Sequence, residues 1–157
     1  MLNTSINRIF KLSLIGLIAF SLMGFAAHQL TVPSIEDRAD ALFRDFDELQ
    51  RLGAYVVGED GEKLGDISKG LGSDSLGNPY GAGNEYKSNG LFNSFGKYGG
   101  QFNATSAFNS LATKPPSILI RRNGDVYSVG LLTTNKLAPT RGQRINPYLL
   151  KAWLQSK

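Results

Sequence analysis

Apolar and charged positions alternate with a helical period between Ser34 and Leu52. Apolar residues recur every three or four positions, and nearly all the positions between them are charged or polar. Ser34, followed three residues later by Asp37, resembles an N-terminal capping box, and Gly53 is suited to end the helix. The pattern predicts an amphipathic helix over 34–52 whose apolar stripe packs on the core.

Two segments have the pattern of β-hairpins. Over 54–68, a short run of strand-forming residues precedes Asp60-Gly61, a turn dipeptide, and a return strand can follow. Over 117–132, Asn123-Gly124 separates two apolar runs, which is the strongest short hairpin signal. Both segments are therefore predicted to be antiparallel hairpins.

The end of the chain has a second helical pattern. A polar loop that carries Arg141 and Arg144 follows the second hairpin, and Asn146-Pro147 can then open a helix. We predict this helix over 146–156, with Trp153 on its apolar face as a core anchor.

Residues 71–116, between the hairpins, contain three copies of a repeat of 15 or 16 residues. Each copy centres on an asparagine, and the three are Asn78, Asn93 and Asn109. Counted from that asparagine, apolar residues recur at positions −7, −2 and +2. They are Leu71, Tyr86 and Phe102 at −7, Leu76, Leu91 and Ala107 at −2, and Tyr80, Phe95 and Leu111 at +2.

A unit of this length is too short to bury its own apolar face, so the copies are expected to stack and share a core. The three asparagines are predicted to hold the corners, because an asparagine side chain can bond to nearby backbone. The alternative is a series of loops wrapped over a small sheet. The predicted fold class is α+β and β-rich: a short Gly/Asn repeat array, either a small solenoid or a looped sheet, closed by hairpins, with an N-terminal amphipathic helix and a C-terminal helix.

The first 26 residues have the pattern of a signal peptide. Arg8 and Lys11 precede an apolar run over 12–27, and small residues at Gly24 and Ala26 suit cleavage after Ala26. The run is short for a membrane span, which needs about 20 apolar residues. We predict a signal peptide over 1–26 and a single exported domain over 27–157, periplasmic or secreted, with no transmembrane span after cleavage. An uncleaved N-terminal membrane anchor is the alternative.

Charge is unevenly distributed along the predicted domain. Residues 27–66 hold ten acidic and four basic side chains, a net charge of −6, whereas residues 67–157 hold three acidic and eleven basic ones, a net charge of +8. The two parts can attract one another, or the second can offer a cationic face to an anionic partner.

Composition leaves little apparatus for catalysis. The chain has no Cys and a single His, His28, which lies beside the predicted cleavage site. Thiol chemistry is therefore excluded, and no metal ligand set, cofactor or catalytic residue is expected. A hydrolase that uses carboxylates such as Asp74 and Glu85 is an alternative.

A basic and aromatic surface is the remaining candidate for binding. Its predicted residues are Tyr86, Lys87, Lys97, Tyr98, Arg121 and Arg122. Cations interleaved with aromatic rings can bind nucleic acid, anionic glycans or envelope polymers by charge attraction and stacking. The same aromatics can instead fill the periodic core positions.

Residues 71–136 resemble a group of uncharacterised bacterial exported proteins with tandem Asn-Pro-Tyr/Phe-Gly-like units. The resemblance is clearest at Asn93 to Gly99, and it departs from the pattern at Gly77 and Leu111, which replace aromatics. It implies a bacterial envelope setting and carries no catalytic residue. The function that we predict is a noncatalytic structural or binding module of the cell envelope, with an envelope protein or an anionic polymer as partner.

Overall fold

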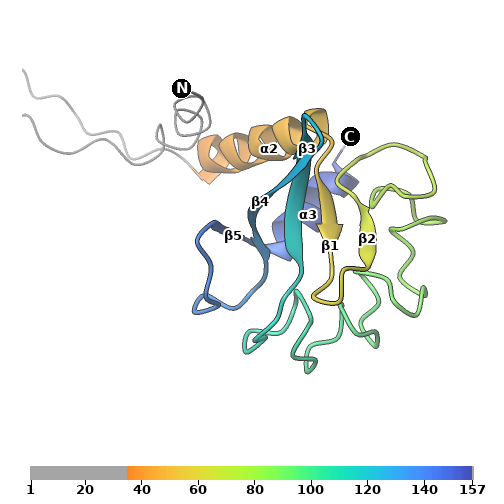
Figure 1. Ribbon diagram of the computed structural model, residues 1–157. Helices are drawn as coiled ribbons and strands as arrows, with labels where there is room; N and C mark the ends of the chain where they lie inside the picture. Colours follow the sequence, from red (N-terminus) through yellow and green to blue (C-terminus); the bar gives the residue numbers. More distant parts are fainter. Residues whose placement is uncertain (1–34, 157) are drawn as a thin grey trace, which may run out of the picture. The chain divides into compact units, whose positions relative to one another are not determined.

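The computed structural model describes residues 35–156, and the predicted signal peptide over 1–26 lies outside this range. Two helices and five strands form an α+β fold (Figure 1). In chain order the elements are α2 (Ile35–Arg51), β1 (Tyr55–Val57), β2 (Lys63–Asp66), β3 (Ser117–Arg122), β4 (Asp125–Leu132), β5 (Gln143–Ile145) and α3 (Pro147–Gln155).

All five strands belong to one open, mixed sheet. Its order is β2-β1-β3-β4-β5, with antiparallel neighbours except for the parallel pair β4 and β5. Because β1 pairs directly with β3, the two hairpins join into one sheet. The prediction that hairpins close a repeat array at either end is therefore wrong.

The turn between β3 and β4 shows why this hairpin forms. Asn123 and Gly124 both have positive φ, 53° and 88°. Positive φ at both central residues is what a type I′ turn requires, and asparagine and glycine accept it at the lowest cost.

Strand β5 lies where a polar loop was predicted. Its three residues pair with residues 130–132 of β4, and a Cβ on Gly130 would clash with the backbone of Gln143. The side chains of Gln143 and Arg144 are exposed, so no apolar pattern marks the strand in the sequence. Its pairing comes from the close approach of two distant backbone segments.

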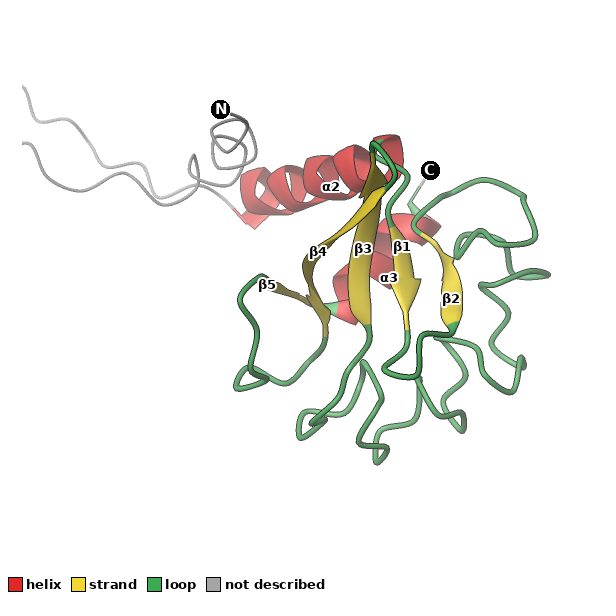
Figure 2. Cartoon of the chain, in the orientation of Figure 1, coloured by secondary structure: helices red, strands yellow, loops and turns green. Residues whose placement is uncertain are grey.

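Both helices pack on the same side of the sheet, and they lie behind it in Figure 2. Phe46 of α2 stacks on Trp153 of α3, with ring centroids 5.6 Å apart, and the Trp153 indole N–H donates to Asp47. Asn146 caps α3, because its side chain accepts a hydrogen bond from the backbone N–H of Tyr148. These contacts fix the two helices to each other and to the core.

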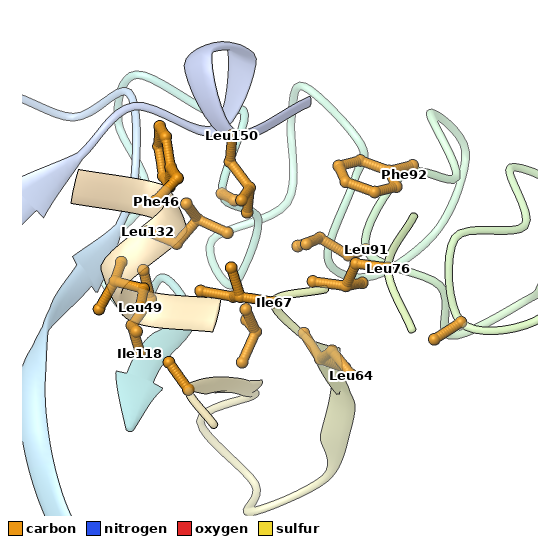
Figure 3. Packing of buried hydrophobic residues seen from close by; sticks show 14 of the residues in the cluster. Phe46, Leu49, Leu64, Ile67, Leu76, Leu91, Phe92, Ile118, Leu132 and Leu150 are labelled. Atoms are coloured by element: carbon orange, nitrogen blue, oxygen red, sulfur yellow. The ribbon is translucent and has the colours of Figure 1, made fainter. Parts of the chain in front are cut away.

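Residues 67–116 connect β2 to β3 as a succession of turns, with one isolated bridge between Asp66 and Ser75. Leu76, Leu91 and Phe92 of this segment join the same buried cluster as residues of the sheet and both helices (Figure 3). The segment is therefore part of the core, although it forms no strand of the sheet.

Candidate binding surface

The three predicted corner asparagines make the same two kinds of hydrogen bond. Each side-chain amide donates to a backbone carbonyl six or seven residues earlier in the chain, and each side-chain oxygen accepts from the backbone N–H at position +2. The donor distances are 2.8 Å for Asn78 to Leu71, 3.0 Å for Asn93 to Lys87 and 3.0 Å for Asn109 to Asn103. Each asparagine thus ties its own turn to the preceding turn.

The apolar positions of the repeat divide into buried and exposed ones. Position −2 is buried in all three copies, at Leu76, Leu91 and Ala107. Positions −7 and +2 are open to solvent. The exposed side chains are Leu71 (86%), Tyr86 (92%) and Phe102 (95%) at −7, and Tyr80 (93%), Phe95 (97%) and Leu111 (79%) at +2.

The turn geometry explains the exposure at position +2. The backbone N–H of Tyr80, Phe95 and Leu111 is bound by the corner asparagine, so the side chain that follows is directed away from the turn. Asn135, outside the repeats, makes the same pair of bonds to Ala112 and Leu137, and Leu137 is likewise exposed. We did not identify Asn135 from the sequence, although the signal, an asparagine two residues before an apolar one, is present there.

Tyr98 does not belong to an open surface. Its ring is fully buried, and a Cβ on Gly58 would lie 2.6 Å from its Cε1 atom, so the glycine leaves the space that the ring fills. Burial raises the pKa of the Tyr98 hydroxyl, which donates a hydrogen bond of 2.6 Å to Asp60. Tyr98 is therefore a core residue with a polar end.

Lys97 is held by the same carboxylate. Its ammonium lies 2.6 Å from Asp60, and the hydrogen bond raises the pKa of Lys97. The hydrogen bonds from Lys97 and Tyr98 hold the pKa of Asp60 well below its usual range. The charge of Lys97 is thus balanced within the protein.

Ion pairs also connect the acidic and basic parts of the chain elsewhere. Lys114 bonds Glu59 at 2.6 Å, and Lys63 bonds Asp74 at 3.1 Å. Lys69 lies 4.8 Å from the centre of the Trp153 ring. These contacts favour the interpretation that the uneven charges attract one another within the fold.

Arg121 and Arg122 lie apart from the repeat residues that were grouped with them. They end β3 at the β3–β4 turn, whereas the start of β3 at Ser117 adjoins the repeats. At roughly 3.3 Å per residue, the length of β3 separates Ser117 from Arg122 by about 17 Å. Of the six predicted surface residues, Tyr86 and Lys87 are the exposed pair in the repeat segment that carries no structural role in this core.

Asp74 and Glu85 are in separate ion pairs. Lys63 bonds Asp74, and Lys151 bonds Glu85 at 2.6 Å. The hydrogen bond from the lysine lowers the pKa of each carboxyl group. A general acid needs a raised pKa, so these two carboxylates are poorly suited to the acid step of glycoside or ester hydrolysis.

Two open grooves lie beside exposed aromatics of the repeats. The first, which we call the Tyr86 groove, has a volume of about 410 Å³, and its lining includes Pro79, Asn84, Glu85, Tyr86, Phe92 and Lys151. The second, the Phe95–Phe102 groove, has a volume of about 430 Å³ and is lined by Ser94, Phe95, Gly100, Gln101, Phe102 and Asn103. Both combine aromatic rings with side-chain amides, the mixture expected of a small-ligand site.

Within residues 35–156, no cluster of acidic or histidine side chains is suited to holding a metal ion. The helices of this described range are too short or too polar to cross a membrane. Comparison with known protein families, with curated proteins and with solved structures finds no match to this chain.

Proposed function

We propose that this protein is a noncatalytic, exported binding module of the cell envelope, in which residues 71–116 form a short repeat array that presents apolar side chains to a partner. The observation that carries the proposal is the almost complete exposure of Tyr80, Tyr86, Phe95 and Phe102. The predicted signal peptide over 1–26 and the resemblance of residues 71–136 to exported proteins support the location.

The energetic argument concerns what these rings gain when they are covered. Burying a large apolar side chain contributes about 1.5–3 kcal/mol, and a side chain left in water contributes almost none of this to folding. Several such side chains on one segment mark an interaction surface. Since position −2 of the same repeat supplies the core, the exposed positions are available for binding.

The proposal is tested by sedimenting the purified full chain with fragments of bacterial cell envelope. We expect the variant Tyr80→Ser/Tyr86→Ser/Phe95→Ser/Phe102→Ser to keep its melting temperature and to lose at least about tenfold of its retention, because it loses four exposed contacts. The matched control is Val126→Thr/Tyr127→Thr, which removes two partly exposed apolar side chains from β4 and keeps strand propensity. Unchanged retention of the fourfold variant would contradict the proposed function.

A further inference from the structure

We propose that the Tyr86 groove and the Phe95–Phe102 groove are two equivalent subsites for one strand of an uncharged polysaccharide. The inference rests on the proposed function, since it names the ligand class of the same surface. Four features of the two grooves support it: their equivalent places in the repeat, their rigid bases, their balanced charges and the chemistry of their linings.

The grooves occupy equivalent places in the repeat. Each contains the residue that follows a corner asparagine, Pro79 in one and Ser94 in the other. Each also contains the aromatic at position −7 of the next copy, Tyr86 in one and Phe102 in the other. The first groove thus lies where copies one and two meet, and the second where copies two and three meet. A polymer of identical sugar units can make similar contacts in both.

The base of each groove is held by side-chain hydrogen bonds to backbone. In the Tyr86 groove, Asn84 accepts at 2.8 Å from the backbone N–H of Tyr86. In the Phe95–Phe102 groove, Asn93 accepts at 3.0 Å from the backbone N–H of Phe95, and Asn103 donates at 2.8 Å to the carbonyl of Gly96. The backbone that carries the rings is therefore ordered before any ligand arrives, which lowers the entropic cost of binding.

The charges beside the grooves are already balanced. Lys151 and Glu85, on opposite sides of the Tyr86 groove, pair at 2.6 Å, and Lys151 also lies 5.5 Å from the centre of the Phe92 ring. The lining of the Phe95–Phe102 groove has no charged residue. An anionic polymer would have to compete with these internal ion pairs, whereas an uncharged ligand would leave them intact.

The chemistry of the linings matches a sugar ring. One face of a pyranose presents C–H groups, which carry partial positive charge and are attracted to the negative face of an aromatic ring. Its hydroxyl groups can both donate and accept hydrogen bonds, as can the side-chain amides of Asn84 and Gln101. Aromatic faces and amides together favour a polysaccharide over a ligand that is purely apolar.

The test is co-sedimentation of the full chain with insoluble chitin and cellulose, compared with heparin-agarose and with vesicles of phosphatidylglycerol and phosphatidylcholine. We expect retention on at least one of the two neutral polysaccharides, with little change between 0.05 and 0.5 M NaCl. Because one strand would fill both grooves, a sugar hexamer should compete at least about tenfold better than the dimer.

Three variants locate the binding. Tyr86→Ala and Phe95→Ala/Phe102→Ala are each expected to weaken retention about tenfold, since each removes the aromatic contacts of one groove. Val126→Thr/Tyr127→Thr should bind as the original chain does. All three should melt as the original chain does, because Tyr86, Phe95 and Phe102 are almost wholly exposed.

The outcomes separate the two proposals. If the chain binds envelope fragments through its exposed aromatics but is retained only on heparin, only on vesicles or on none of these probes, the ligand class is overturned and the proposed function stands. If the chain binds a neutral polysaccharide and the groove variants bind equally well, the two subsites are overturned. If the fourfold variant still binds envelope fragments, the proposed function itself fails.

Discussion

Single polar side chains determine much of the backbone path through residues 71–116. Asn78 is buried, and it donates to the carbonyls of Leu71 and Gly72 while accepting from Tyr80. Asp60 has a comparable role between segments, because it accepts hydrogen bonds from both Lys97 and Tyr98. In each case one side chain satisfies several groups that would otherwise need water.

The Asp60 cluster makes a prediction about pH. The pKa of Asp60 is lowered by folding, so the carboxylate stabilises the native state above its usual pKa of 3.8, and this stabilisation is lost as the pH falls below that value. We expect the melting temperature to fall more steeply between pH 5 and pH 2.5 in the original chain than in Asp60→Asn.

The control is Asp125→Asn, which makes the same charge change outside the cluster, at the start of β4. It should follow the pH profile of the original chain. Identical profiles for the original chain and Asp60→Asn, measured by circular dichroism melts, would show that the cluster contributes nothing to the acid response.

At the scale of the element, the repeat unit is a turn held by its corner asparagine. Asn78 donates two hydrogen bonds from a buried site, whereas Asn93 donates one from a more exposed site. A buried amide that loses its acceptors costs more than an exposed one, because water cannot replace them. The first corner is therefore expected to be the more sensitive.

Replacing the corner amide by a carboxylate tests this difference. Asn78→Asp keeps the acceptor for the N–H of Tyr80 but turns an oxygen toward the carbonyls of Leu71 and Gly72. We expect a loss of about 1–3 kcal/mol in the free energy of unfolding at pH 7, measured by urea denaturation. Asn93→Asp is the matched comparison and should lose less; an equal or smaller loss for Asn78→Asp would refute the argument.

At the scale of the whole molecule, the repeat segment and the sheet share one core. Leu91 is fully buried in the same cluster as Ile118 of β3 and Leu150 of α3 (Figure 3). The repeat segment cannot leave this cluster without exposing part of the sheet and of α3. Unfolding is therefore expected to be a single transition that includes residues 67–116.

Two leucines of the same repeat test this expectation. Leu91→Ala removes a buried side chain and should cost about 2–5 kcal/mol, whereas Leu111→Ala removes an exposed one and should change the free energy of unfolding by less than about 0.5 kcal/mol. Urea denaturation followed by both tryptophan fluorescence and circular dichroism is the measurement. A Leu91→Ala variant as stable as the original would mean that the repeat segment is not part of the cooperative core.

The sequence was informative about the α+β class, and less so about the order of strands and the surface. The pattern around Asn123-Gly124 predicts a hairpin because the turn residues and both strands are contiguous in the chain. No comparable pattern shows that β1 pairs with β3, since about 60 residues separate them. Periodicity also fails to tell buried Leu91 from exposed Leu111, because both are leucines of one repeat unit.

The candidate site shows the same division. Tyr86 and Lys87 were chosen as exposed aromatic and basic residues, and the structure places both at the surface. Tyr98 was chosen on the same grounds, yet it packs beside Gly58, forty residues earlier. Residue type is the same in these cases, and what differs is the neighbour that the fold supplies.

The sequence by itself determined the features that depend on near neighbours in the chain: the cap of α3 at Asn146, the positive-φ turn at Asn123-Gly124, and corner asparagines that bond within seven residues. Such interactions are encoded locally, so short patterns reveal them. The tertiary structure alone decided the pairing of β5, the burial of Tyr98, the ion pairs of Asp60 and Glu59, and which repeat positions face solvent. These depend on contacts between distant segments, which form only when the whole chain has folded.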